Sequence, residues 1–131
     1  MLPLYVVPRR ASGFQQAMRA AQDLESEKVT FVVADNETRR QFVHFLAAYA
    51  TRSESDRNIT LTNGTQCEVL CASMRGKSPK AIVVLVPPVM NGFDTFFFES
   101  VFPFLTLGDV EMVLVGERGA RDALFGTPLR H

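Results

Sequence analysis

Apolar and polar positions along this chain follow two different periods, which indicates strands interleaved with helices. Four short and nearly continuous apolar runs are typical of strands buried on both faces. They cover residues 4–7, 29–34, 81–86 and 110–115. Three longer segments repeat apolar residues every three or four positions, as on one side of a helix. They span residues 13–25, 35–50 and 91–101. This order predicts a three-layer α/β domain with a mostly parallel sheet.

Polar residues mark where the first two helices begin. Ser12 precedes the first helical pattern, and Asp35 or Asn36 precedes the second; such side chains cap helices by accepting hydrogen bonds from the first turn. Asp35 has an alternative role, because it follows a strand at the carboxyl edge of the sheet, where ligands often bind in α/β folds. The residues expected to face the sheet are Phe14, Ala17, Met18, Ala21 and Leu24, then Phe42, Phe45, Leu46 and Tyr49.

An antiparallel hairpin is the clearest local pattern in the chain. Asn63 and Gly64 separate two alternating segments, 59–62 and 65–72. An Asn-Gly pair is preferred in two-residue hairpin turns because both of its positions need a positive φ. The segment just before it, 51–58, is polar and charged, so we expect an exposed loop there.

Length and composition fit one domain over residues 1–131, with a core over 1–116 and a tail over 117–131. The chain has 131 residues, 47% of them apolar, and a formal net charge of zero, so no overall charge draws it towards nucleic acid. No apolar run approaches the roughly 20 residues that span a bilayer, and the start lacks the pattern of a secretion signal. We therefore expect a protein that is located inside the cell and does not bind membranes.

The cysteines and histidines predict neither a disulfide nor a metal site. Cys67 and Cys71 would lie about 13 Å apart on one strand, too far for a disulfide, so we expect two free thiols in a reducing compartment. His44 and His131 have no carboxylate or thiol at the spacing of metal ligands.

The opening segment has the geometry of a phosphate-binding loop without its chemistry. An apolar strand leads through a basic loop with Arg9 and Arg10 to Ser12 and Gly13, where a helix begins and free backbone N–H groups face outwards. A Walker A loop continues with Lys and then Ser or Thr, which bind the phosphates and Mg²⁺, whereas this chain continues with Phe-Gln. Arg9 and Arg10 therefore either bind phosphate, helped by the helix start after Ser12 with Gly13, or are two solvated arginines that flank a turn.

Three segments read together carry a resemblance to a known family. Residues 7–15 read Val-Pro-Arg-Arg-Ala-Ser-Gly-Phe-Gln, residues 59–65 read Ile-Thr-Leu-Thr-Asn-Gly-Thr, and residues 73–78 read Ser-Met-Arg-Gly-Lys-Ser. They resemble the Walker A loop Val-Pro-Arg-Arg-x-Gly-Lys-Thr, the hairpin that follows it and the Arg-Gly loop before Walker B in the ATPase domain of the large terminase subunit. This subunit is the DNA-packaging motor of tailed phages and herpesviruses.

The resemblance covers residues 4–116 and implies a P-loop NTPase-like fold. In such a fold we expect the strand that carries Val83 to lie beside the strand that carries Val6. The chain departs from the family where ATP is hydrolysed. The Walker A position lacks its Lys and its Ser or Thr and has one extra residue. The Walker B strand should end in Asp-Glu, but residues 84–88 read Val-Leu-Val-Pro-Pro.

A later strand should end in small hydroxyl residues but reads Val-Leu-Val-Gly-Glu over residues 113–117. Without the lysine and the two carboxylates, the chain lacks the charge stabilisation on which phosphoryl transfer depends. We therefore expect a degenerate, catalytically inactive pseudo-ATPase that uses no cofactor.

A phenylalanine-dense segment over residues 91–105 is the main candidate for a partner surface. We expect a helix that continues to about Val101 and stops near Pro103. Its rings point in more than one direction, so they either pack in the core or form an exposed patch that binds another copy or a partner protein. The candidate contact residues are Phe93, Phe96, Phe97, Phe98 and Phe102.

Two functions follow from these observations. The leading hypothesis is a viral, terminase-ATPase-like protein without catalysis, which acts through contacts with viral or host proteins or with itself. It would be located in the host cytoplasm or nucleus, or in the virion. The alternative is an accessory factor of viral DNA handling that binds nucleic acid or phosphate through loops at one edge of the sheet. The residues for that role are Arg9, Arg10, Arg75 and Lys77. An active ATPase is a third hypothesis, against which the missing Walker residues count.

Overall fold

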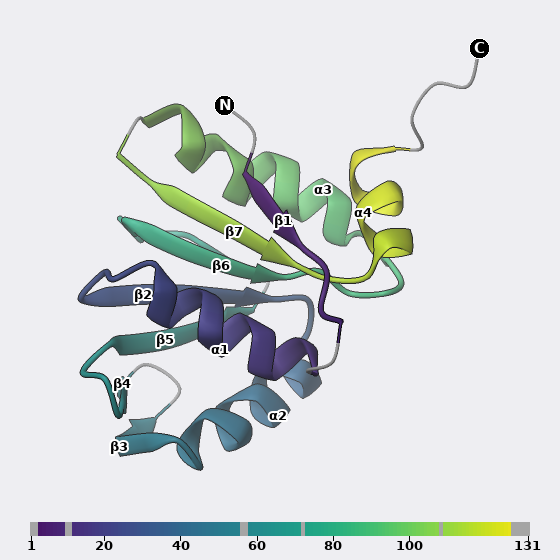
Figure 1. Ribbon diagram of the computed structural model, residues 1–131. Coiled ribbons are helices and arrows are strands. Elements are labelled where there is room, and N and C mark those ends of the chain that lie inside the picture. Colours follow the sequence, from purple (N-terminus) through teal and green to yellow (C-terminus); the bar gives the residue numbers. More distant parts are fainter. Residues whose placement is uncertain (1–2, 10–11, 56–57, 72, 108, 127–131) are drawn as a thin grey trace.

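A computed structural model describes residues 3–9, 12–55, 58–71, 73–107 and 109–126 of the chain (Figure 1). These residues form an α/β domain around one seven-stranded sheet. Its strands are β1 (Leu4–Val6), β2 (Lys28–Val33), β3 (Ala50–Ser55), β4 (Asn58–Leu61), β5 (Gln66–Cys71), β6 (Ala81–Leu85) and β7 (Glu111–Val115). No helix in this part of the chain is both long enough and apolar enough to cross a membrane.

The strands lie in the order β1-β7-β6-β2-β5-β4-β3. Neighbours from β1 to β5 run parallel, whereas β4 is antiparallel to β5 and β3 is antiparallel to β4. The α/β class is thus confirmed, but the sheet is mixed rather than mostly parallel. The expected neighbours Val6 and Val83 are also separated, because β7 lies between β1 and β6.

Helices cover the sheet from both sides (Figure 1). Helices α1 (Gly13–Asp23) and α2 (Asn36–Ala47) pack on one face, and α4 (Arg118–Phe125) packs on the other. The phenylalanine-dense segment also covers that second face. It begins as α3 (Phe93–Phe96), continues as the π-helix η1 (Phe97–Val101) and ends as the 3₁₀ helix η2 (Phe102–Leu107). The helical path therefore continues past Pro103, which is at the start of η2, where its missing N–H is not needed.

Alternation along the central strands divides the core into two layers. Phe31 on β2 and Val83 on β6 point towards α1 and α2, and their neighbours Val32 and Val84 point towards α3 and η1. All four side chains are fully buried. A strand that is apolar at consecutive positions therefore needs cover on both faces, as its sequence predicted.

The prediction of a loop over residues 51–58 is wrong for most of that segment. Residues Ala50–Ser55 form the edge strand β3, which pairs with β4 through two irregularities in register. The side chains of Thr51, Arg52 and Ser53 are exposed, so the segment has no apolar periodicity. Pairing with β4 uses backbone groups, which any polar residue can supply, and composition therefore gave no sign of it.

The predicted hairpin is confirmed, but its turn differs from the predicted two-residue turn. The N–H of Gly64 donates to the carbonyl oxygen of Leu61 at 2.9 Å, and the N–H of Leu61 donates to that of Thr65 at 2.9 Å. Gly64 has a φ of +91°, whereas Asn63 is not among the residues with positive φ. This is the longer hairpin turn, in which a single left-handed glycine follows an ordinary turn. Asn63 supports it by accepting a hydrogen bond from the N–H of Thr65 at 3.1 Å.

We predict that Gly64→Ala lowers the free energy of unfolding by about 1–2 kcal/mol, because a Cβ is disfavoured at this φ. A Cβ at Gly64 would meet no atom within 4 Å, so the loss is conformational rather than steric. Urea unfolding monitored by circular dichroism measures it. Gly119→Ala is the matched control, because Gly119 is in α4 and a Cβ there would also meet no atom within 4 Å. This substitution should raise the free energy of unfolding by up to about 1 kcal/mol. Equal effects at both positions would contradict this assignment of the turn.

Candidate functional site

A cleft of about 720 Å³ opens at the carboxyl ends of the parallel strands. It is formed by the segments that follow β1, β2, β6 and β7, which meet at one edge of the sheet (Figure 1). The chain leaves β2 towards α2 on one face and leaves β6 towards α3 on the other, so a crevice forms between these neighbouring strands. In open α/β sheets this is the place where ligands bind. The lining includes Ser12, Gly13, Phe14, Asp35, Thr38, Val86, Pro87, Pro88, Val89, Asn91, Gly116 and Glu117.

Helix α1 begins at the rim of the cleft, as the sequence predicted. Ser12 is the N-cap, and its hydroxyl oxygen accepts a hydrogen bond from the N–H of Gln15 at 3.1 Å. The next residues include Phe14, whose ring lies 5.1 Å from that of Phe42 on α2. The helix start therefore has the position of a phosphate-binding loop, while the side chain after Gly13 packs between helices.

Asp35 caps α2 and lines the same cleft. Its Oδ1 accepts a hydrogen bond from the N–H of Thr38 at 2.7 Å. This hydrogen bond lowers the pKa of the Asp35 carboxyl, so the residue is a carboxylate at neutral pH. Asp35 therefore caps α2 and also lines the cleft at the carboxyl edge of the sheet, so its position allows both of the roles considered for it, helix cap and ligand contact.

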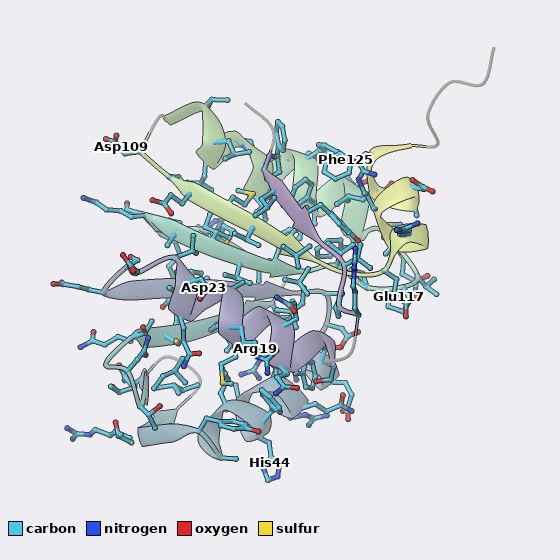
Figure 2. The ribbon with its side chains drawn as sticks, viewed as in Figure 1. Arg19, Asp23, His44, Asp109, Glu117 and Phe125 are labelled. Carbon is cyan, nitrogen blue, oxygen red and sulfur yellow. The ribbon has the colours of Figure 1, made fainter. Side chains whose placement is uncertain are left out.

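Tyr5 and Gly116 hold the ends of β1, β6 and β7 close together at the cleft. The Tyr5 hydroxyl donates to the carbonyl oxygen of Glu117 at 2.8 Å. Burial raises the pKa of Tyr5 to about 12, so the phenol stays a protonated donor at physiological pH. A Cβ on Gly116 would lie 2.5 Å from the Tyr5 hydroxyl and 3.0 Å from the Cβ of Val86. Position 116 therefore requires glycine, because the ends of the strands approach each other closely there. The next residue, Glu117, lines the cleft (Figure 2).

The charges of the cleft do not suit a phosphate. Among the described lining residues, the charged side chains are the carboxylates of Asp35 and Glu117. Arg9 is exposed on the nearby loop but does not line the cleft, and Arg10 lies outside the described residues. Phosphoryl transfer depends on cations that neutralise the phosphate oxygens, and two carboxylates oppose that requirement.

The predicted basic residues do not gather at one edge of the sheet. Lys77 lies beside Lys28 at the start of β2, away from the carboxyl-edge cleft where Ser12 and Gly13 are placed. Its Nζ forms an ion pair with the buried Glu68 at 3.2 Å. The other oxygen of Glu68 accepts a hydrogen bond from the Thr30 hydroxyl at 3.1 Å. This buried group ties the connection between β5 and β6 to the sheet, and Arg75 is exposed on the same connection.

The phenylalanine set divides between core and surface. Phe93 and Phe97 are buried, Phe96 and Phe102 are partly buried, and Phe98 is 41% exposed. The Phe98 ring lies 5.9 Å from that of Phe125 on α4, which is 38% exposed (Figure 2). A partner could therefore contact Phe98 and Phe125 most readily, whereas Phe93 and Phe97 are out of its reach.

Burial raises the pKa of both cysteine thiols, which disfavours the reactive thiolate. Both are free, as predicted, with Cys67 buried and Cys71 partly buried. Burial raises the pKa of the Cys67 thiol to about 12, and the thiolate is the form that reacts. Within the described ranges, no three His, Cys, Asp or Glu side chains are arranged to hold a metal ion.

Sequence reasoning found Ser12, Gly13 and Asp35 but missed that Gly116, Glu117 and Asn91 share their cleft. The sequence did carry a signal for Gly116 and Glu117. Like Asp35, they follow an apolar strand, and parallel strands end at the same edge of the sheet. Asn91 gave no such signal, because it comes several residues after the end of β6. The chain turns back at this residue, whose backbone φ is +44°.

Comparison with protein-family models, with curated protein sequences and with solved structures found no match to this chain. The resemblance to the terminase ATPase domain therefore stays a prediction that rests on the residues of this chain alone.

We predict that Asp35→Ala lowers the free energy of unfolding by about 1 kcal/mol at neutral pH through loss of the cap. Because the pKa of Asp35 is lowered in the folded state, its stabilisation is present above the unfolded pKa. It is lost as the pH falls below about 4, so wild type and variant should converge there. Asp35→Asn is the control, since Asn also caps helices but does not titrate. A difference from alanine that is constant down to acid pH would contradict this role.

Gly116→Ala should lower the free energy of unfolding by about 1–3 kcal/mol, because its Cβ displaces the Tyr5 hydroxyl or Val86. The same substitution in a Tyr5→Phe background should cost less, since the nearest atom has been removed. Denaturant unfolding of the four proteins in this double-mutant cycle gives the coupling energy directly. Strictly additive effects would mean that Tyr5 and Gly116 do not meet as described.

Proposed function

We propose that this chain is a catalytically inactive, terminase-ATPase-like viral protein that acts through contacts with other proteins. The observation that carries the proposal is the composition of the cleft. The loops in the Walker A and Walker B positions, after β1 and β6, line the same cleft, although β7 separates their strands.

A remnant nucleotide site explains this convergence. In an ATPase of this kind, a phosphate-binding loop and a pair of metal-binding carboxylates must face a common space. Ser12 and Gly13 line this cleft, and so do Pro87 and Pro88, which follow the strand that corresponds to Walker B in the proposed comparison. The prolines cannot bind Mg²⁺, and Phe14 replaces a residue that would bind phosphate. The geometry of a site is kept while its chemistry is missing.

Protein contact is the role that fits the described surface best. Leu4, Val89, Phe98 and Phe125 are exposed apolar side chains, and Val89 is at the rim of the cleft with 63% of its surface exposed. Contiguous exposed apolar groups often mark interaction surfaces, and the rings of Phe98 and Phe125 are adjacent. A protein derived from a packaging motor in this way would act inside the infected cell or in the virion.

The nucleic-acid hypothesis has weaker support. It depends on a joint basic surface, yet Lys77 is paired with Glu68 and lies away from the loop that carries Arg9. If DNA were nevertheless a ligand, its affinity would fall steeply with salt concentration. Fluorescence anisotropy with labelled DNA over a salt series measures this, and we expect no saturable binding at physiological salt.

We predict no heat of binding when Mg²⁺-ATP is titrated into the protein up to high micromolar concentration. The physical reason is that the cleft presents Asp35 and Glu117 to the phosphates and lacks the lysine of a Walker A loop. Isothermal calorimetry on the full chain makes the measurement, with an assay of phosphate release on the same sample. Arg9→Ala/Arg10→Ala is the control variant.

Saturable binding with a Kd below about 100 μM that is lost in the control variant would overturn the inert cleft. It would mean that the basic loop still holds phosphate. Phosphate release that survives in the control variant would instead refute the comparison with Walker motifs altogether.

A further inference from the structure

We propose that the free edge of β1 and the neighbouring helix α4 form a groove that takes an extended, carboxylate-bearing segment of a partner protein as an additional strand. The inference rests on the proposed role in protein contacts but not on the inert cleft. It assigns that role to one surface and one mode of recognition.

The outer edge of β1 has backbone groups available for pairing. Among the described strands, β1 is the last one of the sheet, and within the described residues it pairs only with β7. The carbonyl oxygen of Val6 accepts a hydrogen bond from the N–H of Gly116 at 3.1 Å, so Val6 faces β7. Backbone groups alternate in direction along a strand, and the N–H and C=O of Tyr5 therefore point away from the sheet. An added strand can use this pair directly.

A groove of about 770 Å³ runs beside this edge. Pro3, Tyr5 and Val7 line it from β1 and its flanks, and Arg121 and Phe125 line it from α4. α4 is beside β1 in Figure 1, on the face of the sheet that also carries α3. Side chains of an added strand that point to this face would enter the groove, while its backbone pairs with Tyr5. Strand addition gains affinity from the backbone and specificity from such pockets.

Apolar side chains are exposed at the groove. Leu4 is 64% exposed and Phe125 is 38% exposed. Phe98, beside Phe125, extends the apolar surface beyond the groove. Natural edge strands are usually protected by charged residues or by cover from another element. β1 carries no charge in its Leu-Tyr-Val sequence, so it presents an apolar edge.

The charges of α4 indicate the chemistry of the occupant. Arg118 and Arg121 line the groove against a single carboxylate, Asp122. Within the described part of the chain, neither guanidinium forms an ion pair. Arginine binds a carboxylate through two parallel hydrogen bonds, and an Asp or Glu on the added strand would satisfy them.

A second copy of this chain fits the groove less well than a different protein. Its own free edge, Leu4–Val6, offers no carboxylate to the arginines. Pro3, next to that edge, has no N–H to contribute to pairing with another copy. The occupant is therefore a partner segment with apolar residues at every second position and an acidic residue among them.

The test uses a random-peptide display library as its probe, selected against the full wild-type chain. We expect enriched peptides with apolar alternation and an Asp or Glu, and no enrichment of basic peptides. A synthetic peptide from the selection should bind at least roughly tenfold more weakly to Arg118→Glu/Arg121→Glu and to Leu4→Lys. Arg19→Glu is the matched control, because Arg19 is an exposed arginine on α1, on the other face of the sheet (Figure 2).

Hydrogen exchange distinguishes strand pairing from a general effect of charge, because charge alone would not protect one backbone N–H of β1. The outward N–H of Tyr5 should exchange more slowly when the peptide is bound, because it becomes paired. Enriched peptides that bind the double variant as well as wild type, an unchanged exchange rate at Tyr5, or no enrichment at all would each overturn the proposal. Concentration-dependent dimers that are abolished by Leu4→Lys would assign the edge to a second copy instead. Binding of Mg²⁺-ATP would refute the inert cleft and leave these outcomes unaffected.

Discussion

Strands β2 and β6 present apolar side chains to both faces of the sheet, and water is excluded from them only if both faces are covered. Phe31 and Val83 require α1 and α2 on one side, and Val32 and Val84 require α3 and η1 on the other. At about 1.5–3 kcal/mol for each fully buried large side chain, this burial is the main driving force for the arrangement. The chain must therefore leave the neighbouring strands β2 and β6 in opposite directions, and that divergence opens the cleft at their carboxyl ends.

The cleft and the outer edge of β1 are linked by the same few residues. Tyr5 is on β1, points to the face covered by α4 and binds the carbonyl oxygen of Glu117. Gly116 lets the strand ends approach each other, and the segment after it enters α4. The close approach of Tyr5 and Gly116 thus determines both the rim of the cleft and the position of α4 beside the outer edge of β1. A partner strand that bound this edge would contact residues directly connected to the cleft.

If the proposed comparison with an ATPase site holds, the contrast between the geometry of the site and its chemistry has a physical basis. Backbone positions around the cleft follow from strand order and from the helix caps Ser12 and Asp35, which also stabilise the fold. Catalytic side chains are under no such structural requirement, because lysine and aspartate at a cleft rim add little to stability. In the proposed comparison with an ATPase site, Pro87 and Phe14 stand at positions of this second kind.

The sequence by itself determined the local features of this protein. It identified the helix starts at Ser12 and Asp35, the buried strands and the position of the hairpin, because capping, apolar period and turn residues act over a few positions. Only the tertiary structure decided the pairing of polar β3, the place of β7 between β1 and β6, the separation of Lys77 from the basic loop, and the burial of Phe93 and Phe97. These depend on contacts between segments far apart in the chain, whose backbone pairing and packing leave no periodic signal in either segment alone.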